Sequence, residues 1–460
     1  MKGITFNRVS NKLVNTKGDD IMLKKSFVTG LCILACCAGM EAEAAPRPAI
    51  PYTVRGGLPN FFRKAEAGSG TVKVGYFGGS ITAAAGWRVQ TLAWMNETFK
   101  GVKFVEINGA ISGTNSSLGA YRLQQDVLQH KPDMVFIEFA VNDGGPEEVE
   151  IRSMEGIVRQ IWRQNPETDV CFVYTMTGNM LKEFEAGNLP RVAGMMEIVA
   201  DYYKIPSIHM GYHVAELHRA GKLVFQSKEN EETRRKILAE QGIWHFTGDN
   251  VHPFGDTGHP LYTDAVKEGF KAIRDNVQPS ILKHELITPL RADNLETAKM
   301  VQIEPWMLKG TWRKMDSKTE QPAKQMVWRM PNMWVAESVG SSIEFKFKGT
   351  EVRIYDLSGP DCGIVTYTID GKNLGRSIRM TQGYWSDCYI LGTVDAGRNL
   401  EDGIHTVKVE IAPEPIADKL KFLNNSPKYK NMTAEELAAS PFNKQNWYVS
   451  NVLIVGDIVK

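Results

Sequence analysis

Between about residues 70 and 280, short apolar segments alternate with longer segments whose apolar residues recur at the helical period. The short segments are rich in β-branched and aromatic residues, which favour strands; they cover 72–77, 103–107, 134–139, 169–175 and 205–210. The longer segments predict helices at 86–99, 116–129, 149–164, about 190–203 and about 262–276. Strands joined by helices of this length form right-handed crossovers in a parallel sheet that is covered on both faces. The pattern therefore predicts a doubly wound α/β layer.

After about residue 300 the pattern changes to strands whose apolar residues alternate. These strands are predicted at 343–356, 363–371, 405–412 and 447–458, and no alternation of helix and strand remains. A domain of about 150 residues with this pattern is typical of an antiparallel β-sandwich. We therefore expect a chain built from a lead-in at 45–69, the α/β domain at 70–280, a linker at 281–304 and the sandwich at 305–460.

A charged stretch (SKENEETRRKILAE) interrupts the region 221–248. It predicts an exposed helix inserted before the last loop of the α/β layer, because a charge run of this kind most often forms a solvated face.

The first residues have the pattern of an export signal. Lys24 and Lys25 precede an apolar run at 27–38, and Ala-Glu-Ala at 42–44 supplies a small-x-small cleavage pattern. The run is too short to span a membrane. We expect a signal peptide at 1–44 and a secreted, periplasmic or cell-surface protein without an integral membrane span.

Two features leave the details of export open. Met22 is an alternative start, because the preceding residues are polar and unpatterned. Cys36 and Cys37 follow Leu34-Ala35, which makes a lipoprotein signal the competing interpretation. Both interpretations take the protein out of the cytoplasm.

Composition excludes some partners. The formal net charge is +1 and no basic block occurs, so neither nucleic acid nor an anionic membrane surface is an expected partner. Cys171 lies in an apolar strand segment and is expected to be a small buried side chain. Cys362 and Cys388 lie in the C-terminal region, where export permits a disulfide, but their pairing stays open. The oligomeric state is likewise open.

Two motifs follow the first two strands of the α/β layer. Residues 78–82 read Gly-Gly-Ser-Ile-Thr, and the two glycines permit a tight turn that exposes Ser80 at the carboxyl edge of the sheet. Residues 108–114 read Asn-Gly-Ala-Ile-Ser-Gly-Thr, in which a glycine can present its backbone N–H to an oxyanion. Taken alone, each motif is also typical of an ordinary turn.

Two further motifs add polar side chains. Asn142 follows the strand at 134–139, where its amide can donate to developing negative charge. Asp249 stands three residues before His252, so one loop supplies a base and a carboxylate that can fix its tautomer. A turn and a surface pair are the alternatives for these two motifs in isolation.

In this order and at these strand ends, the four motifs resemble the SGNH/GDSL hydrolase family over about residues 70–280. The four residues that name the family correspond to Ser80, Gly113, Asn142 and His252. The resemblance implies that Ser80 is the nucleophile, that His252 is the base oriented by Asp249, and that the oxyanion hole consists of the N–H groups of Ser80 and Gly113 with the Asn142 amide.

Two positions depart from the family pattern. The nominal Gly-Asp-Ser-Leu reads Gly-Gly-Ser-Ile, so Gly79 replaces the usual aspartate, and the glycine usual two residues before Asn142 reads Ala140. Neither position belongs to the triad, so the departures concern the subfamily. A Gly-x-Ser-x-Gly nucleophile elbow is also absent from the sequence, which argues against an ordinary α/β-hydrolase.

Other candidate site residues have weaker support. Trp87 and Arg88 follow the nucleophile closely and could line the substrate pocket, although core packing and a surface contact are at least as likely. Tyr384 and Trp385 could stack on a sugar ring, but strand aromatics more often belong to a core.

A metal site is not expected. His245, His252 and His259 recur every seven residues, but this spacing matches no common zinc pattern. Neither a metal nor another cofactor is therefore predicted.

The resemblance implies a carboxylic ester hydrolase. With the export signal and the tryptophan-containing sandwich, it suggests a secreted esterase that removes acyl groups, foremost acetyl, from a carbohydrate; this step is an analogy. A lipase or phospholipase-type acylhydrolase is the second interpretation. The third is a carbohydrate-binding protein on the same scaffold, which the intact set of four motifs argues against.

Overall fold

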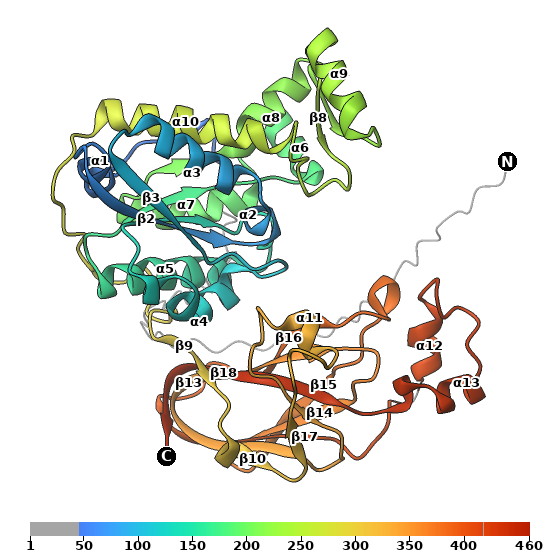
Figure 1. Cartoon of the computed structure of the whole chain (residues 1–460). Helices are drawn as coiled ribbons and strands as arrows, with labels where there is room; N and C mark the ends of the chain where they lie inside the picture. Colours follow the sequence, from blue (N-terminus) through green and yellow to red (C-terminus); the bar gives the residue numbers. More distant parts are fainter. Residues whose placement is uncertain (1–45, 417) are drawn as a thin grey trace, which may run out of the picture. The chain divides into compact units, whose positions relative to one another are not determined.

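The computed structural model describes residues 46–460 with the exception of residue 417 (Figure 1). The predicted signal peptide, with its alternative start and its paired cysteines, lies outside the described residues. In the part of the chain that is described, no helix has the length and apolar character needed to cross a membrane.

A six-stranded sheet forms the first layer. Its order is β1-β6-β5-β4-β2-β3, with β1 antiparallel at one edge and the other strands parallel. This order is the flavodoxin-like one, so the predicted fold class is confirmed. The strands are β1 (Tyr52–Thr53), β2 (Gly70–Gly78), β3 (Val102–Asn108), β4 (Met134–Glu138), β5 (Asp169–Val173) and β6 (Ser207–Ile208).

Helices cover both faces of this sheet (Figure 1). Successive side chains of β4 point to opposite faces and both sets are apolar, so both faces need a cover. Phe136 packs with helices on one face, whereas Val135 and Ile137 pack with helices on the other. The face of Phe136 holds α1 (Pro59–Ala65), α3 (Trp87–Thr98), α8 (Met210–Arg219) and α10 (His259–Asn276). The opposite face holds α4 (Ser116–Asp126), α5 (Glu147–Gln164) and α7 (Arg191–Tyr203). Two short helices, α2 (Ser80–Ala83) and α6 (Leu181–Glu185), lie in loops.

The charged insertion forms the predicted helix, α9 (Glu231–Gln241). It joins β7 (Leu223–Gln226) to β8 (Trp244–Thr247), and these strands form a parallel pair that the sequence did not reveal. Most of α9 is exposed, but Arg234 is buried and binds Asp256 at 2.8 Å. Its guanidinium also lies 3.7 Å from the centre of the Phe254 ring. These contacts attach α9 to the loop that follows His252.

The C-terminal strands pair antiparallel throughout the described part of their sheet, as predicted for the sandwich. They are β9 (Ala298–Gln302), β10 (Leu308–Lys309), β11 (Trp312–Lys314), β12 (Trp334–Ala336), β13 (Ser342–Ser358), β14 (Ile364–Ile369), β15 (Lys372–Ile378), β16 (Ile390–Gly397), β17 (Gly403–Ile411) and β18 (Trp447–Val459). Short helices between them are α11 (Ala323–Met326), α12 (Lys419–Asn424) and α13 (Ala434–Ala439). Single 3₁₀ turns along the chain are η1 (Leu128–His130), η2 (Gly178–Met180), η3 (Pro305–Met307), η4 (Gly383–Trp385) and η5 (Pro441–Asn443).

The long strand β13 organises the sandwich. Its first half pairs with β17 and its second half with β16, while β18 accompanies both halves. The change of partner follows Gly349, which has a φ of 156° and faces Gly456, with a φ of 140°. An added Cβ at Gly349 would lie 2.1 Å from the Val455 carbonyl oxygen, so only glycine fits where the two strands bend.

Two details differ from the sequence-based picture of this region. Strand β9 lies inside 281–304, so part of the expected linker belongs to the second sheet; the domain boundaries themselves stay predictions.

Cys362 and Cys388 are free thiols, and Cys362 is fully buried. The disulfide that the sequence left open therefore does not form in this structure. Cys171 is also fully buried, as predicted.

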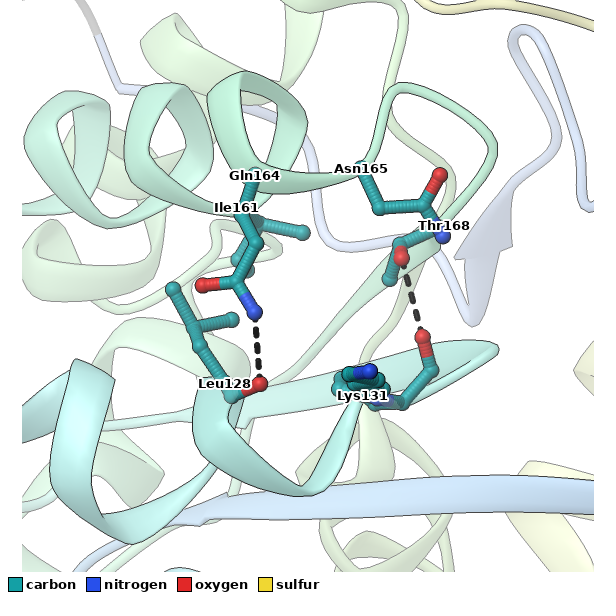
Figure 2. Close-up of a pocket in the computed structure, with 7 residues that line it drawn as sticks. Leu128, Lys131, Ile161, Gln164, Asn165 and Thr168 are labelled. Atoms are coloured by element: carbon teal, nitrogen blue, oxygen red, sulfur yellow. Dashed lines mark hydrogen bonds between the residues drawn. The ribbon is translucent and has the colours of Figure 1, made fainter.

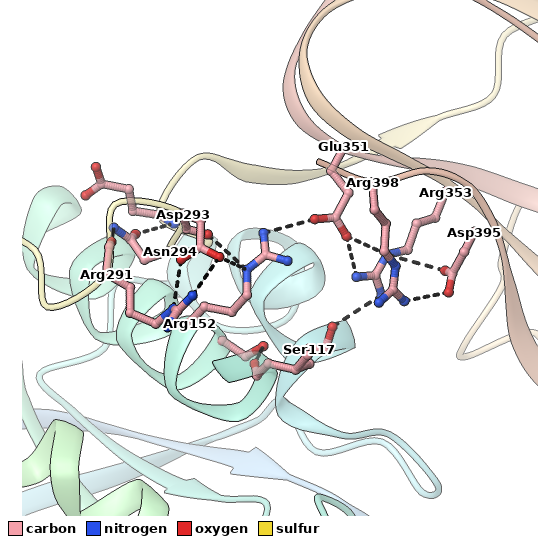
Figure 3. Close-up of polar contacts among 12 residues, drawn as sticks. Ser117, Arg152, Arg291, Asp293, Asn294, Glu351, Arg353, Asp395 and Arg398 are labelled. Carbon is pink, nitrogen blue, oxygen red and sulfur yellow. Dashed lines mark hydrogen bonds and ion pairs between the residues drawn. The ribbon is translucent and has the colours of Figure 1, made fainter. Parts of the chain in front are cut away.

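A buried ion pair joins β13 to α5, and a buried hydrogen bond joins it to α4 (Figure 3). Glu351 accepts hydrogen bonds from Arg152 at 3.0 Å and from Arg353 Nε at 2.8 Å. Arg353 also donates to the Ser117 hydroxyl at 3.2 Å. Apolar side chains of β13 and β18 belong to the same core cluster as those of α4 and α5. The α/β layer and the sandwich thus share one interior.

Candidate active site

The nucleophile motif forms a tight turn between β2 and α2. Strand β2 ends at Gly78, and Ser80 is the first residue of α2. A Cβ at Gly78 would lie 2.4 Å from the carbonyl oxygen of Glu138, and one at Gly79 would lie 1.9 Å from Oδ1 of Asn142. Gly78 therefore lets the end of β4 approach the turn that presents Ser80, and Gly79 lets the loop after β4 approach it.

The three residues predicted as the triad lie in hydrogen-bond contact. Ser80 Oγ is 2.8 Å from His252 Nε2, and His252 Nδ1 is 2.7 Å from Asp249 Oδ2. Ser80 is partly buried, and the His252 side chain is 50% exposed. A substrate can therefore reach both groups. The arrangement has the geometry of a hydroxyl nucleophile, a general base and an orienting carboxylate.

Hydrogen bonds within the loop fix the charge of Asp249. Its Oδ1 accepts from the backbone N–H of His252 at 2.7 Å, from that of Val251 at 3.0 Å and from the Thr247 hydroxyl at 3.0 Å. Partial burial acts to raise the pKa of Asp249, but these hydrogen bonds and the His252 ring outweigh burial and hold the pKa well below its usual range. An ionised Asp249 requires a proton on Nδ1, so neutral His252 presents an unprotonated Nε2 to Ser80.

The predicted oxyanion residues come from the loops after β3 and β4. Gly113 has a φ of 74°, a conformation that favours glycine, and an added Cβ there would meet open space. The side-chain amide of Asn142 lies against Gly79, beside Ser80. Asp143 accepts a hydrogen bond from the backbone N–H of Ser116 at 2.9 Å, which ties the Asn142 loop to the start of α4.

A buried carboxylate beneath the nucleophile turn escaped the sequence analysis. Glu138 is 1% exposed and accepts hydrogen bonds from Thr82 at 2.8 Å and Thr175 at 2.5 Å. Burial raises the pKa of Glu138, although these hydroxyls and the Gly79 N–H act in the opposite direction. A glutamate at the end of an apolar strand was the available signal, because buried carboxylates need partners.

Trp87 and Arg88, for which the sequence left a substrate pocket and core packing open, are both buried. Trp87 is fully buried and packs against the rings of Tyr76 and Phe136. Arg88 is 6% exposed, pairs with Glu106 and donates to the Thr82 carbonyl at 3.0 Å. Both side chains point inward because α3 turns this face to the sheet. Arg88 holds the end of α2 in place.

The three histidines at seven-residue spacing have separate partners. His245 Nδ1 lies 2.6 Å from the Ser227 hydroxyl, and His259 Nδ1 accepts from the Trp87 N–H at 3.1 Å. Burial, with the nearby His252, lowers the pKa of His259 to about 4, so this ring stays neutral. Within residues 46–460 as described, no group of three or more His, Cys, Asp or Glu side chains could hold a metal ion.

A cavity of about 200 Å³ lies elsewhere in the α/β layer (Figure 2). It is bounded by η1, α5 and the segment before β5, where Gln164 donates to the Leu128 carbonyl at 2.6 Å and Thr168 donates to that of Pro132 at 2.9 Å. These segments lie at the amino ends of β4 and β5. Ser80 and Asn142 follow carboxyl ends of strands, so the cavity is not part of the candidate active site.

Comparison with known proteins finds a family model that matches this part of the chain. Residues 76–253 match the model of the GDSL-like lipase/acylhydrolase family. None of the curated proteins matches the sequence significantly.

Solved structures extend the similarity to the second domain. A two-domain esterase described as active on acetylated mannans aligns with a TM-score of 0.65 and 20% identity, over 89% of this chain and 98% of that chain. Its co-crystal with mannopentaose aligns with a TM-score of 0.63 and 21% identity, over 89% and 97%. At this identity the comparison establishes the shared fold.

Proposed function

We propose that this chain, whose residues 76–253 match the model of the GDSL-like lipase/acylhydrolase family, is a carboxylic ester hydrolase, namely an exported serine esterase that removes acetyl groups from a carbohydrate. The observation that supports this best is the continuous chain of contacts from Ser80 through His252 to Asp249, at 2.8 Å and 2.7 Å. Such a chain converts a weak hydroxyl nucleophile into a strong one.

In the first half of the proposed reaction, Ser80 Oγ attacks the acetyl carbonyl carbon while His252 Nε2 takes the hydroxyl proton. The carbonyl oxygen becomes an oxyanion, which the N–H groups of Ser80 and Gly113 and the amide of Asn142 stabilise. The bond from the carbonyl carbon to the sugar oxygen then breaks. His252 Nε2 gives its proton to that oxygen, so a sugar hydroxyl leaves and Ser80 stays acetylated.

In the second half, a water molecule attacks the acetyl group on Ser80. His252 takes a proton from the water, and the oxyanion forms again in the same place. The bond to Ser80 Oγ breaks, His252 returns the proton to Oγ, and acetate leaves. Asp249 keeps its charge throughout and stabilises the transient imidazolium.

The carbohydrate assignment rests on the architecture. The structures that share the fold over 89% of this chain include an esterase described as active on acetylated mannans. The sandwich also exposes aromatic side chains that suit stacking on sugar rings: Trp306 is 37% and Trp328 54% exposed. The predicted signal at 1–44 would bring the enzyme to such a polymer outside the cytoplasm.

Hydrolysis of 4-nitrophenyl acetate, butyrate and octanoate by the mature protein, beside Ser80→Ala, tests the reaction. We expect the acetate to be the best substrate and the variant to lose at least about 10³-fold in kcat. Full activity of Ser80→Ala would reject the nucleophile. Rates that rise toward octanoate would favour a lipid acylhydrolase, and no hydrolysis of any ester would favour the binding-protein alternative.

Release of acetate from acetylated polymers tests the substrate class. Acetylated mannan is the first polymer to measure, with acetylated xylan as the comparison and chemically deacetylated mannan as the blank. We expect acetate release from at least one of the two polymers, abolished by Ser80→Ala. Activity on 4-nitrophenyl acetate without release from either polymer would remove these carbohydrates as substrates.

A further inference from the structure

The side chain of Arg122, on α4, lies wholly inside the α/β layer. Its exposed fraction is 0%, and its guanidinium lies 4.4 Å from the centre of the Phe77 ring. One nitrogen, Nη1, donates to Asp126 at 2.8 Å, but Asp126 is its only carboxylate partner among the described residues. A buried cation is costly unless further acceptors satisfy its donors. The further acceptors of Nη1 and Nη2 belong to the loops of the active site, whereas Nε has no partner among the described residues.

Arg122 holds the peptide group that precedes the nucleophile turn. Its Nη2 donates to the Gly78 carbonyl at 3.0 Å, and the N–H of Ile111 donates to the same oxygen at 3.0 Å. On the other side of this peptide, the N–H of Gly79 faces the carboxylate of Glu138. Because both polar groups of the peptide are bound, its plane cannot rotate. The next peptide carries the N–H of Ser80.

Arg122 holds the loop around Gly113 as well. Nη1 donates to the Gly109 carbonyl, where this loop begins, and Nη2 donates to the Thr114 hydroxyl at 2.9 Å. The Thr114 hydroxyl in turn donates to the Ile111 carbonyl at 2.7 Å. Gly113 therefore lies between two fixed residues. Ile111 is bound to the nucleophile turn through Gly78, and Thr114 is bound to the guanidinium.

We propose that Arg122 is the positioning residue of the oxyanion hole, because one rigid guanidinium fixes the spacing between the backbone N–H of Ser80 and that of Gly113. The fork of donors in arginine suits this task, since it reaches three backbone or hydroxyl oxygens at fixed angles. This inference rests on the proposed function. Arg122 does not touch the substrate and acts through the two loops.

Arg122→Gln tests the proposal, with kcat and KM for 4-nitrophenyl acetate and the inhibition constant of phenylboronic acid as readouts. The boronate forms a tetrahedral adduct with the serine and so reports on the oxyanion hole directly. We expect kcat per folded molecule to fall about 100-fold with KM within about threefold. The inhibition constant should rise by about the same factor as kcat/KM falls.

Asp126→Asn is the matched control. The asparagine removes the charge of the ion pair, but its carbonyl oxygen can still accept from Arg122, and the hydrogen bonds to Gly78, Gly109 and Thr114 stay. This variant should unfold at lower temperature yet keep kcat and boronate inhibition within about threefold of the wild type. If Arg122→Gln does not fold, Arg122→Lys and Thr114→Val replace it, with expected losses of about tenfold in kcat because each keeps only part of the network.

Arg122 variants that keep wild-type kcat/KM and boronate affinity would overturn the proposal, as would equal losses in Asp126→Asn. These outcomes are distinct from a failure of the proposed function. In that case the wild type itself would lack esterase activity, or Ser80→Ala would keep it.

Discussion

Single residues determine how the reacting groups face one another. In Asp249, Oδ1 takes two backbone N–H groups and a hydroxyl, which leaves Oδ2 for the His252 ring alone. In Gly79, the missing side chain leaves room for the amide of Asn142. The charge of Asp249 thus fixes the tautomer of His252, and the absence of a Cβ at Gly79 lets the Asn142 amide lie beside Ser80.

Asp249→Asn should lower kcat for 4-nitrophenyl acetate about 10³–10⁴-fold at pH 7 while the protein stays folded. An amide opposite Nδ1 can donate where the carboxylate only accepts, which favours the wrong tautomer of His252. Thr247→Val is the control, because it removes one donor to the same carboxylate and should cost less than about tenfold. An Asp249→Asn enzyme with more than a tenth of the wild-type kcat would contradict the tautomer argument.

Gly79→Asp restores the residue usual in the family, yet we expect it to lower kcat about 10–100-fold. Its Cβ would occupy the position 1.9 Å from Asn142 Oδ1, and the flexible amide would move away from Ser80 before the backbone did. Ala140→Gly restores the other unusual position and serves as the control, with kcat unchanged within about threefold. The kcat values of the two variants for 4-nitrophenyl acetate check this prediction. A Gly79→Asp enzyme as active as Ala140→Gly would show that the Asn142 amide tolerates the added Cβ.

At the scale of elements, the start of α5 and the loop before it contain two buried carboxyl groups. Glu150 accepts from the Gly144 N–H at 2.6 Å, and Asp143 accepts from Ser116 at the start of α4. One carboxyl oxygen of each has no partner among the described residues. Burial raises the pKa of Asp143 to about 6, and burial together with the Asp143 charge raises that of Glu150 to about 7.

These raised pKa values predict a loss of stability toward alkaline pH. Above about pH 4 the unfolded chain releases these protons while the folded protein keeps them, so the free energy of unfolding falls as pH rises from about 4 through about 7. Glu150→Gln removes one of the two groups and keeps an acceptor for Gly144. At pH 8 it should gain about 1–2 kcal/mol over the wild type, with little gain at pH 4.

Urea unfolding at pH 4, 6 and 8 measures this effect. Glu148→Gln is the control, because Glu148 lies in the same helical turn but is exposed. This variant should show the same pH dependence of stability as the wild type. If the free energies of unfolding of Glu150→Gln and the wild type change with pH in the same way from pH 4 to 8, the proton on Glu150 does not contribute to the pH dependence of stability.

At the scale of the molecule, the shared interior argues that the sandwich cannot be removed. Tyr355 and Leu357 of β13 lie in one core cluster with Tyr121 of α4 and Ile157 of α5. Arg152 would lose its buried partner Glu351 if β13 were absent. Exposing this core and leaving a buried charge unpaired are both strongly destabilising.

We therefore expect a chain that ends before β9 to be insoluble or to lack a cooperative transition, whereas the whole protein should unfold in a single calorimetric transition. Glu351→Gln in the whole chain should lower the free energy of unfolding by about 3–5 kcal/mol, and Glu410→Gln, on the partly exposed strand β17, by less than about 1 kcal/mol. Two separate transitions in the whole protein, or a soluble and cooperative short chain, would contradict a shared core.

The amino-acid sequence was enough to predict the main strands and helices of the α/β layer, the class of both domains and the triad candidates. These features depend on local patterns: alternation of apolar residues, helical periodicity, and short motifs at the ends of strands. Parallel topology then brings the carboxyl ends of β2, β3 and β4 to one edge, so the sequence alone was enough to place residues that are far apart in the chain close together in space.

Which polar groups are buried, and what they bind, depends on how the elements pack in three dimensions. Trp87 and Arg88 follow the nucleophile in sequence but turn into the interior, whereas Arg122 and Glu138 lie beneath the active site without any motif to mark them. Likewise, the close approach of β13 and β18 at Gly349 and Gly456 was not marked by any motif. Contacts of this kind depend on the distances between segments far apart in the chain, and no local pattern encodes those distances.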